Sequence, residues 1–207
     1  MMKKTLPEKT VERLSLLRRL LLTRHTSHIY SHEIGKLMNQ TSVQIRRDLM
    51  LMGYSGSPGK GYEVKTLINA IGKVIDPEET LYAAIIGMGN LGNAIGKYLL
   101  HKREHLKILA SFDNDERKVN NCVSGIKCYH ISQLPQVVGD YGISIGIITV
   151  PEQAANEIKD LLVSSGIKGI LNFSPVPLQV PAHVYLTEYD MVTSIEKTAY
   201  FIKSLHY

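Results

Sequence analysis

The spacing of apolar residues divides the chain into a helical first third and a longer part in which strands and helices alternate. A first helix is predicted after Pro7, which suits a first helical turn, and its apolar side is Val11, Leu14, Leu17 and Leu21. A polar stretch over residues 25–28 ends it. Ser31 is predicted to cap a second helix, whose apolar side is Ile34, Leu37 and Met38.

A third helix is predicted after a two-residue turn. Thr41 and Gln44 have the spacing of a capping box, and a buried stripe follows at Ile45, Leu49 and Met52. The side chains left facing outward near the start of this helix are Gln44, Arg46 and Arg47. Two short helices joined by a tight turn, the second presenting Gln and Arg, are typical of a helix-turn-helix.

Residues 54–64 predict a β-hairpin wing. Tyr54 and Tyr62 flank a tip rich in Gly and Pro, and Lys60 stands near that tip, where it could reach a phosphate or a minor groove. The first third is therefore interpreted as a winged helix, although a module of three helices and a hairpin could equally bind a protein. Residues 67–75 predict a helical connector and 76–79 an exposed boundary, which places the first domain at 1–77.

A glycine-spaced turn opens the second part of the chain. The apolar strand at 82–86 runs into Gly87-Met88-Gly89-Asn90-Leu91-Gly92, and a helix is predicted from Asn93 to residue 100. Strand, G-x-G-x-x-G and helix in this order form the turn that holds a dinucleotide pyrophosphate at a helix N-terminus. Gly87 permits the tight turn, and Gly89 lets the backbone approach the phosphates.

The alternation of strands and helices continues to the end of this part. Strands are predicted at 108–113, 143–151, 169–175 and 184–187, with a helix at 152–165, which is the pattern of a Rossmann-type parallel sheet over 78–188. Asp113 ends its strand 21 residues after Gly92, near the spacing at which a carboxylate accepts from the adenine ribose. Such a carboxylate repels a 2′-phosphate and favours NAD(H); the alternative is an ordinary turn residue at a strand end.

The last segment, 189–207, is predicted to be an amphipathic helix with Val192, Ile195, Ala199 and Ile202 on one side. It has no later element to pack on. It therefore either lies on its own sheet or docks on a partner subunit.

Charge is distributed unevenly along the chain. Residues 1–65 hold 12 of the 24 Lys and Arg but only 5 of the 19 Asp and Glu, so this third is basic on a nearly neutral body. That asymmetry favours a nucleic-acid-binding module over a protein-binding one. No run is long enough for a membrane span, and Pro7, Glu8 and Glu12 interrupt any signal-peptide core, so a cytoplasmic protein is expected. Cys122 and Cys128 lack metal spacing and are expected to be free thiols rather than a disulfide.

Residues for catalysis are not evident beside the predicted cofactor site. The histidines after the glycine turn fall in stretches interpreted as polar surface, and no Tyr-x-x-x-Lys pair follows that turn. A cofactor site without an acid–base group predicts a sensor. The alternative is a small NAD(P)-dependent oxidoreductase or a CoA-binding enzyme subunit.

The chain resembles Rex, a family of redox-sensing transcriptional repressors of Gram-positive and related bacteria. The resemblance covers nearly the whole chain, and the segments that carry it are 43–49, 59–64, 87–92, 110–115, 147–151 and 166–176. It implies a homodimer of winged-helix and Rossmann domains whose C-terminal helices are exchanged between subunits. It also implies binding to double-stranded operator DNA, release of that DNA when NADH binds, and no metal.

Site residues are carried over from the resemblance by position. Those implied at the NAD(H) cofactor are Gly87, Met88, Gly89, Asn90, Leu91, Gly92, Tyr98, Asp113, Asn114, Thr149, Val150, Pro151, Asn172, Phe173 and Ser174. Those implied at DNA are Ser42, Gln44, Arg46, Arg47, Lys60 and Tyr62. A state-dependent polar network between domains and across subunits is implied for Arg19, Tyr98 and Asp190.

The chain also departs from the family pattern at three places. Ser57 and Pro58 replace the basic pair of the wing, Met191 replaces an aromatic or aliphatic residue after Asp190, and Glu196-Lys197 alters the start of the last helix. Each lost phosphate contact lowers affinity for DNA and its salt dependence. A further alternative is therefore a diverged paralogue that binds DNA with a weakened redox response.

Overall fold

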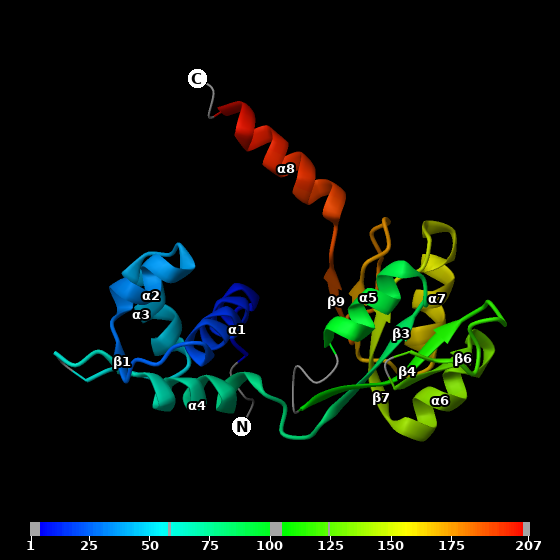
Figure 1. Ribbon diagram of the computed structural model, residues 1–207, viewed down its shortest axis with the longest axis horizontal. Coiled ribbons are helices and arrows are strands. Elements are labelled where there is room, and N and C mark those ends of the chain that lie inside the picture. The colour runs from blue at the N-terminus through cyan, green and yellow to red at the C-terminus, as the bar shows by residue number, and fades with distance from the viewer. Residues whose placement is uncertain (1–4, 58, 100–104, 124, 205–207) are drawn as a thin grey trace. The chain divides into compact units, whose positions relative to one another are not determined.

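The computed structural model describes residues 5–57, 59–99, 105–123 and 125–204. The chain divides between Glu78 and Glu79 into two units (Figure 1). The first unit is mostly helical, and the second is built on a parallel sheet.

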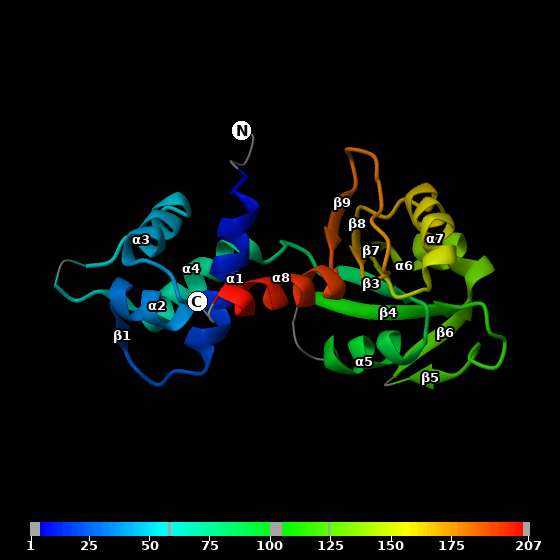
Figure 2. The ribbon, with the colours of Figure 1, turned by 90° about the horizontal axis from the view of Figure 1, so that it is seen from above.

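The first unit packs four helices around one apolar core (Figure 2). Its elements in chain order are α1 (Glu8–Leu22), β1 (His28–Ile29), α2 (Ser31–Met38), α3 (Ser42–Leu51), β2 (Tyr62–Glu63) and α4 (Val64–Ile75). The predicted helical spacing is confirmed because Leu14, Leu17 and Leu21 of α1 are all buried in that core. Residues 67–75 were predicted to be only a connector. That prediction is wrong, because Leu67 and Ile71 of α4 are fully buried in the same core.

The start of α2 also differs from the prediction. Ser31 is the first helical residue, and Tyr30 is the N-cap, whose backbone N–H donates to the Glu33 carboxylate at 2.7 Å. Leu37, expected on the apolar side, is 38% exposed, whereas Ile34 and Met38 are buried. Helical spacing alone wrongly predicted that Leu37 is buried, because the buried side of this short helix is Ile34, Gly35 and Met38.

The wing is organised differently from the predicted hairpin. β2 pairs antiparallel with β1, so the strand partner of Tyr62 is Ile29 rather than a residue near Tyr54. Between Tyr54 and Tyr62, an antiparallel bridge joins Ser57 and Gly61. Pro58, one of the departures from the family pattern, lies outside the described residues.

The second unit is a seven-stranded sheet in the order β5-β6-β4-β3-β7-β8-β9. All neighbouring pairs are parallel except β5 with β6. The predicted Rossmann-type sheet is therefore confirmed, with its switch point between β3 and β7. The elements are β3 (Leu81–Ile86), α5 (Asn90–Leu99), β4 (Leu106–Asp113), β5 (Cys122–Val123), β6 (Ile126–His130), a 3-10 turn (Ile131–Gln133), α6 (Leu134–Tyr141), β7 (Ile143–Ile148), α7 (Glu152–Ser164), β8 (Gly169–Asn172), β9 (Tyr185–Glu188) and α8 (Met191–Ser204).

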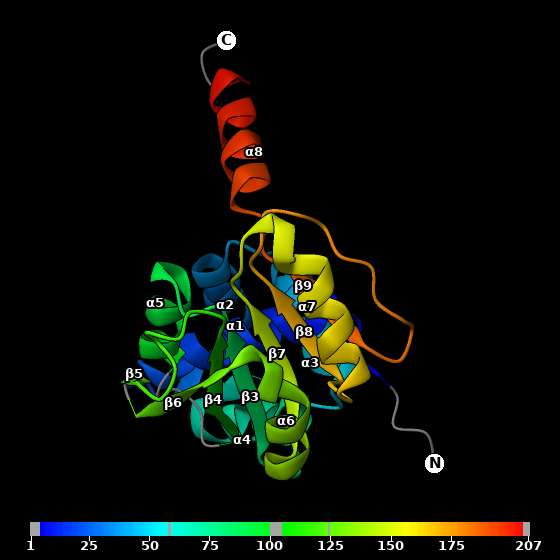
Figure 3. The same ribbon diagram turned by 90° about the vertical axis from the view of Figure 1, so that its right-hand side faces the viewer.

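Helices cover both faces of this sheet, α5 on one side and α6 with α7 on the other (Figure 3). Along β3, Ala84 and Ile86 face the α6–α7 core, whereas Ala83 and Ile85 face the α5 side. The prediction missed β6 and α6. In β6 the buried positions are Ile126 and Cys128, alternating with polar or half-buried residues, which left too few aliphatic residues to signal a strand.

The last helix, α8, is exposed along its described length. Every side chain from Met191 to Lys203 is exposed, including Ile195 at 69%. The alternative that this helix buries its apolar side on its own sheet is therefore wrong. Its N-terminus is capped by Asp190, whose carboxylate accepts from the backbone N–H groups of Val192 and Thr193.

Candidate functional site

The glycine turn after β3 is held by direct contact with the end of β7. A Cβ on Gly87, whose φ is 99°, would lie 2.8 Å from the Thr149 carbonyl oxygen, and a Cβ on Gly92 would lie 2.1 Å from the Gly87 carbonyl oxygen. Both positions therefore require glycine. A Cβ on Gly89 would meet nothing within 4 Å, which leaves that stretch of backbone open to a ligand.

The helix after this turn begins inside the motif. α5 starts at Asn90, three residues before the predicted Asn93. The free N–H groups of its first turn therefore open directly at Gly89, and an anion placed there meets the positive end of the helix dipole.

A cavity of about 810 Å³ lies at the carboxyl ends of β3, β4, β7 and β8. In an open parallel sheet this edge at the switch point is where ligands bind. Its lining includes ten of the predicted cofactor residues: Gly87, Gly89, Asn90, Leu91, Asp113, Asn114, Thr149, Val150, Pro151 and Phe173. Sequence reasoning missed the lining from Lys118, from Ile131 and Ser132 after β6, and from the α7 residues Ala154, Glu157, Ile158 and Leu161.

Asp113 ends β4 at the floor of this cavity. Its Oδ2 accepts from the Met88 backbone N–H at 2.8 Å and from Lys118 Nζ at 2.9 Å, and its Oδ1 accepts from the Asp115 N–H at 2.9 Å. Burial would raise the pKa of Asp113, but the hydrogen bonds from Lys118, Asp115 and Met88 outweigh it and hold that pKa below its ordinary value. The carboxylate is thus ionised at neutral pH, and Oδ1 retains a lone pair for a further donor.

Three predicted cofactor residues hold the walls of the cavity rather than presenting free polar groups. The Thr149 hydroxyl lies 2.7 Å from the Gly87 carbonyl oxygen and donates to it, which ties β7 to the glycine turn. Asn172 and Ser174 are 1% and 7% exposed and bond to each other, Ser174 Oγ donating to Asn172 Oδ1 at 2.6 Å. Both lie behind the lining, where they brace the loop after β8.

Phe173 lines the cavity and connects it to the residue before the last helix. Its ring stacks on Tyr189 with centroids 4.5 Å apart and planes within 5°. The Tyr189 backbone N–H also donates to the Asn172 carbonyl oxygen at 2.9 Å. The aromatic pair therefore joins the cavity wall to Asp190, the N-cap of α8.

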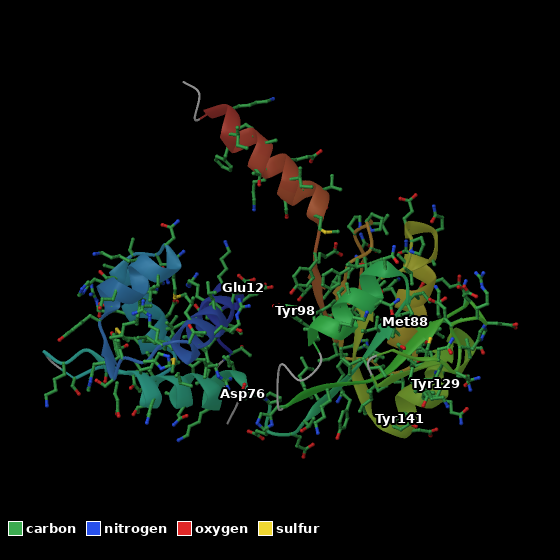
Figure 4. The ribbon with its side chains drawn as sticks, viewed as in Figure 1. Glu12, Asp76, Met88, Tyr98, Tyr129 and Tyr141 are labelled. Carbon is green, nitrogen blue, oxygen red and sulfur yellow. The ribbon has the colours of Figure 1, made fainter. Side chains whose placement is uncertain are left out.

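The residues expected in a switching network lie on three elements. Arg19 is exposed on α1, Tyr98 is 63% exposed near the end of α5 (Figure 4), and Asp190 caps α8. Met88, also labelled there, contributes its backbone to Asp113, while its side chain is buried. A network among the three stays a prediction.

On α3, the predicted DNA-reading residues do not all face outward. Arg46 and Arg47 are exposed, as is Lys60 in the wing segment, and Ser42 is half-buried. Thr41 caps the helix as predicted, accepting from the Gln44 N–H at 3.1 Å. The prediction that the Gln44 side chain completes a capping box is wrong, because its amide instead donates to Asp48 Oδ1 at 3.0 Å.

Tyr62, which was expected to contact DNA, is nearly buried. Its side chain is only 8% exposed, and its ring packs against Tyr54 with centroids 6.2 Å apart. Tyr62 is part of the apolar core of the first unit and contributes to its packing. Two residues of α3, Val43 and Met50, are far more exposed at 65% and 73%, and sequence reasoning missed them.

An ion pair between the buried Asp48 and the half-buried Arg13 fixes α3 against α1. Arg13 donates to both carboxylate oxygens of Asp48, at 2.6 and 2.7 Å, and the Thr10 hydroxyl donates to the same group at 3.1 Å. Burial would raise the pKa of Asp48, but hydrogen bonds from Arg13, Gln44 and Thr10 outweigh it and lower that pKa. Such a bidentate pair sets the rotation of α3, and hence which side chains face outward.

The described residues also bear on the cysteines, on metal ligands and on membrane spans. Cys122 and Cys128 are free thiols, as expected. Within the described ranges, no group of His, Cys, Asp and Glu has the arrangement of a metal site. None of the described helices combines the length and the apolar character needed to cross a membrane.

Comparison with known proteins matches both units. Residues 5–49 match the family model "Putative DNA-binding protein N-terminus", and residues 78–176 match "CoA binding domain". The redox-sensing transcriptional repressor Rex of Anoxybacillus flavithermus is 39% identical over 98% of this chain and 95% of its own length. The chain belongs to the Rex family. Rex of Bacillus subtilis is 38% identical, over 98% of this chain and 94% of its own length.

Solved structures of a Rex-family repressor, RSP, match the whole fold. RSP in complex with β-NAD+ and operator DNA has a TM-score of 0.89 and 30% identity, covering 99% of this chain and 95% of RSP. RSP with β-NADH has a TM-score of 0.86 and 29% identity, covering 99% and 97%. The Rex relatives are repressors, which confirms the prediction of a regulator and removes the oxidoreductase alternative. The CoA-binding match over residues 78–176 covers most of the Rossmann unit but not the first unit. The repressor relatives match 98% of the chain, so the comparisons do not favour the alternative of a CoA enzyme subunit.

Proposed function

We propose that this chain is a redox-sensing transcriptional repressor that binds operator DNA and releases it when NADH binds. One observation supports this most strongly. A cavity built on a glycine turn and a helix N-terminus lies in the same chain as a helix-turn-helix that presents Arg46 and Arg47. Membership of the Rex family, and the RSP complexes with both nucleotide forms and with operator DNA, support the same assignment.

The residues of the cavity suit a dinucleotide. The open backbone at Gly89 and the first turn of α5 would hold the pyrophosphate, and the free lone pair of Asp113 Oδ1 would accept from the adenine ribose. When bound, the cofactor supplies a nicotinamide ring whose two redox forms differ by a hydride and a positive charge. Phe173, near the loop after β8, would lie toward the nicotinamide end of the cofactor.

For the reading side of the repressor we propose Arg46 and Arg47 of α3, with Ser42 and Gln44 at its start and Lys60 in the wing. Arg46 is held by a hydrogen bond from its Nη1 to the Ser31 hydroxyl at 3.1 Å. Arg47 is exposed and can turn toward a phosphate or a base. Basic side chains on the first turns of a second helix are how a helix-turn-helix positions itself in a major groove.

We further propose a cytoplasmic homodimer in which α8 packs on the partner subunit. The apolar residues Met191, Val192, Ile195, Tyr200, Phe201 and Ile202 are between 49% and 69% exposed, and a helix with so large an apolar surface normally requires a partner. Arg19, Tyr98 and Asp190 would then form the network that responds to the cofactor. Sedimentation of wild type and Ile195→Asp tests this, since the charged variant should shift toward monomer.

The repressor function is tested by a titration of DNA release. An operator duplex obtained by selection from random sequences is labelled, bound, and titrated with NADH or NAD+ while anisotropy is recorded. NADH should release the duplex at concentrations where NAD+ does not, which corresponds to a coupling of about 1–3 kcal/mol. Binding of DNA without release by either nucleotide would contradict the sensor.

The diverged-paralogue alternative is motivated by Ser57 in the wing and by Met191, which is 61% exposed at the start of α8. Calorimetric titration of NADH into the DNA-free protein distinguishes such a paralogue from an NADH-responsive repressor. A paralogue that has lost the response by losing the cofactor would show no NADH binding, whereas a sensor would bind NADH more tightly than NAD+.

A further inference from the structure

The outward side of α3 is a stripe in which two arginines stand between two apolar side chains. The positions Val43, Arg46, Arg47 and Met50 recur at intervals of three, one and three, so they share one side of the helix. Val43 and Met50 are 65% and 73% exposed. With Leu51, which is 40% exposed, these residues border a shallow groove of about 430 Å³.

Packing within the first unit does not account for the apolar part of this stripe. The buried side of α3 is Ile45, Asp48 and Leu49, and the Arg13–Asp48 pair fixes that side against α1. Val43 and Met50 are consequently held outward, away from the core. The β-branched Val43 also lowers helix propensity, so helix stability does not account for a valine at this exposed position.

The charge of the stripe indicates what covers it. An apolar protein partner would have to bury Arg46 and Arg47, which stand between the two apolar side chains, and burying unpaired charge is costly. The major groove of DNA offers phosphates and guanine edges to the arginines and also offers one apolar group, the C5-methyl of thymine. A stripe that alternates apolar and guanidinium side chains is complementary to that surface.

We propose that Val43 and Met50 contact thymine methyl groups and thereby determine part of the sequence specificity. This inference rests on the proposed DNA-binding function and deepens it. Val43 lies in the first turn of α3, the part of a recognition helix that contacts base edges. Met50 follows seven residues later, about 10 Å along the axis, so the two side chains reach base pairs no more than about three steps apart at ~3.4 Å per step.

The test removes single methyl groups from the DNA. Binding sites are selected from randomised duplexes with the full-length protein, and each thymine of an enriched site is then replaced singly by deoxyuridine, which lacks only the methyl. Dissociation constants are measured by anisotropy for wild type, Val43→Ala and Met50→Ala. At about 0.8 kcal/mol per buried methyl, wild-type affinity should fall about fourfold at each contacted thymine.

The double-mutant design separates contact from a general loss of binding. At the thymine that Val43 contacts, deoxyuridine should cost Val43→Ala nothing further, and Met50→Ala should behave likewise at a second thymine. Val74→Ala is the matched control, because Val74 is an exposed valine on α4 at 41% and should keep the full wild-type response.

Three results would overturn the inference, and they differ in what else they affect. Enriched sites that tolerate deoxyuridine at every thymine, or equal losses in wild type and both variants, would refute the methyl contacts and leave the repressor function standing. Failure to enrich any duplex would refute DNA reading as a whole, and the methyl contacts with it.

Discussion

Gly89→Ala is the change that best separates cofactor binding from folding. A methyl at this position meets no protein atom within 4 Å, and the backbone φ is not in the left-handed region, so the fold should accept it. The methyl would instead occupy the space through which the backbone approaches the pyrophosphate. Loss of one charge-assisted hydrogen bond to a phosphate costs about 1.5–3 kcal/mol, which is a fall in NADH affinity of about 10- to 100-fold.

Two further glycine variants serve as controls for that measurement. Gly139→Ala on α6 makes the same chemical change at another open position and should leave NADH affinity unchanged. Gly92→Ala would place a Cβ 2.1 Å from the Gly87 carbonyl oxygen, so it should destabilise the second unit by about 1–3 kcal/mol, as overpacking does. Thermal unfolding ranks stability, and calorimetry gives the affinities.

The readout that matters most is the DNA complex. Gly89→Ala should bind the selected operator as tightly as wild type but require correspondingly more NADH for release. If this variant bound NADH and released DNA at wild-type concentrations, the glycine turn would not be the pyrophosphate site. If it lost DNA binding at the same time, the separation between the two functions would be wrong.

Four further outcomes follow from the same geometry. Arg46→Ala with Arg47→Ala should weaken operator binding and lower the slope of log affinity against log salt by about 2, provided both arginines contact phosphates; an unchanged slope in filter binding or anisotropy would contradict this. Arg13→Ala leaves the Asp48 carboxylate buried without its cation and should destabilise the first unit by about 3 kcal/mol in urea unfolding. Folding lowers the pKa of the Asp48 carboxyl, so the contribution of Asp48 to the free energy of unfolding is fully present above the ordinary pKa of 3.8 and is lost as the pH falls through the lowered pKa. Asp48→Asn should therefore make the free energy of unfolding less dependent on pH in this acid range. Tyr189→Ala removes a stacking partner of the cavity wall, worth about 1 kcal/mol, and should weaken NADH binding about fivefold in calorimetry while leaving NADH-free DNA binding unchanged.

Much of the architecture was predictable because its signals are local. The glycine turn, the strand before it, the helix after it and the capped start of α3 each depend on a few consecutive residues, and the structure has them. Asp113 was identified by its distance along the chain from Gly92, and it lies in the cavity lining. Periodicity of apolar residues likewise predicted α1, α7 and the parallel sheet.

The sequence could not determine which side chains are free to act, because that depends on contacts between distant segments. Gln44 was expected to present a free amide to DNA, but one N–H of that amide already donates to Asp48, which Arg13 of α1 fixes. Thr149 is engaged by the Gly87 carbonyl oxygen across the β3–β7 switch point. A donor or acceptor occupied by a remote partner is chemically unlike a free one, and spacing along the chain does not distinguish them.

The same reason explains what the sequence left unnoticed. Val43 and Met50 look like ordinary apolar residues of a short helix, and Lys118 like an ordinary surface lysine. Only the packing of α3 on α1 turns the first two outward, and only the path of the chain after β4 brings Lys118 to 2.9 Å from Asp113. Residue types and local spacing thus determined the fold of each unit, the position of α3 in the first unit and the position of the glycine turn in the second. Long-range packing decided which groups face the cofactor and the DNA.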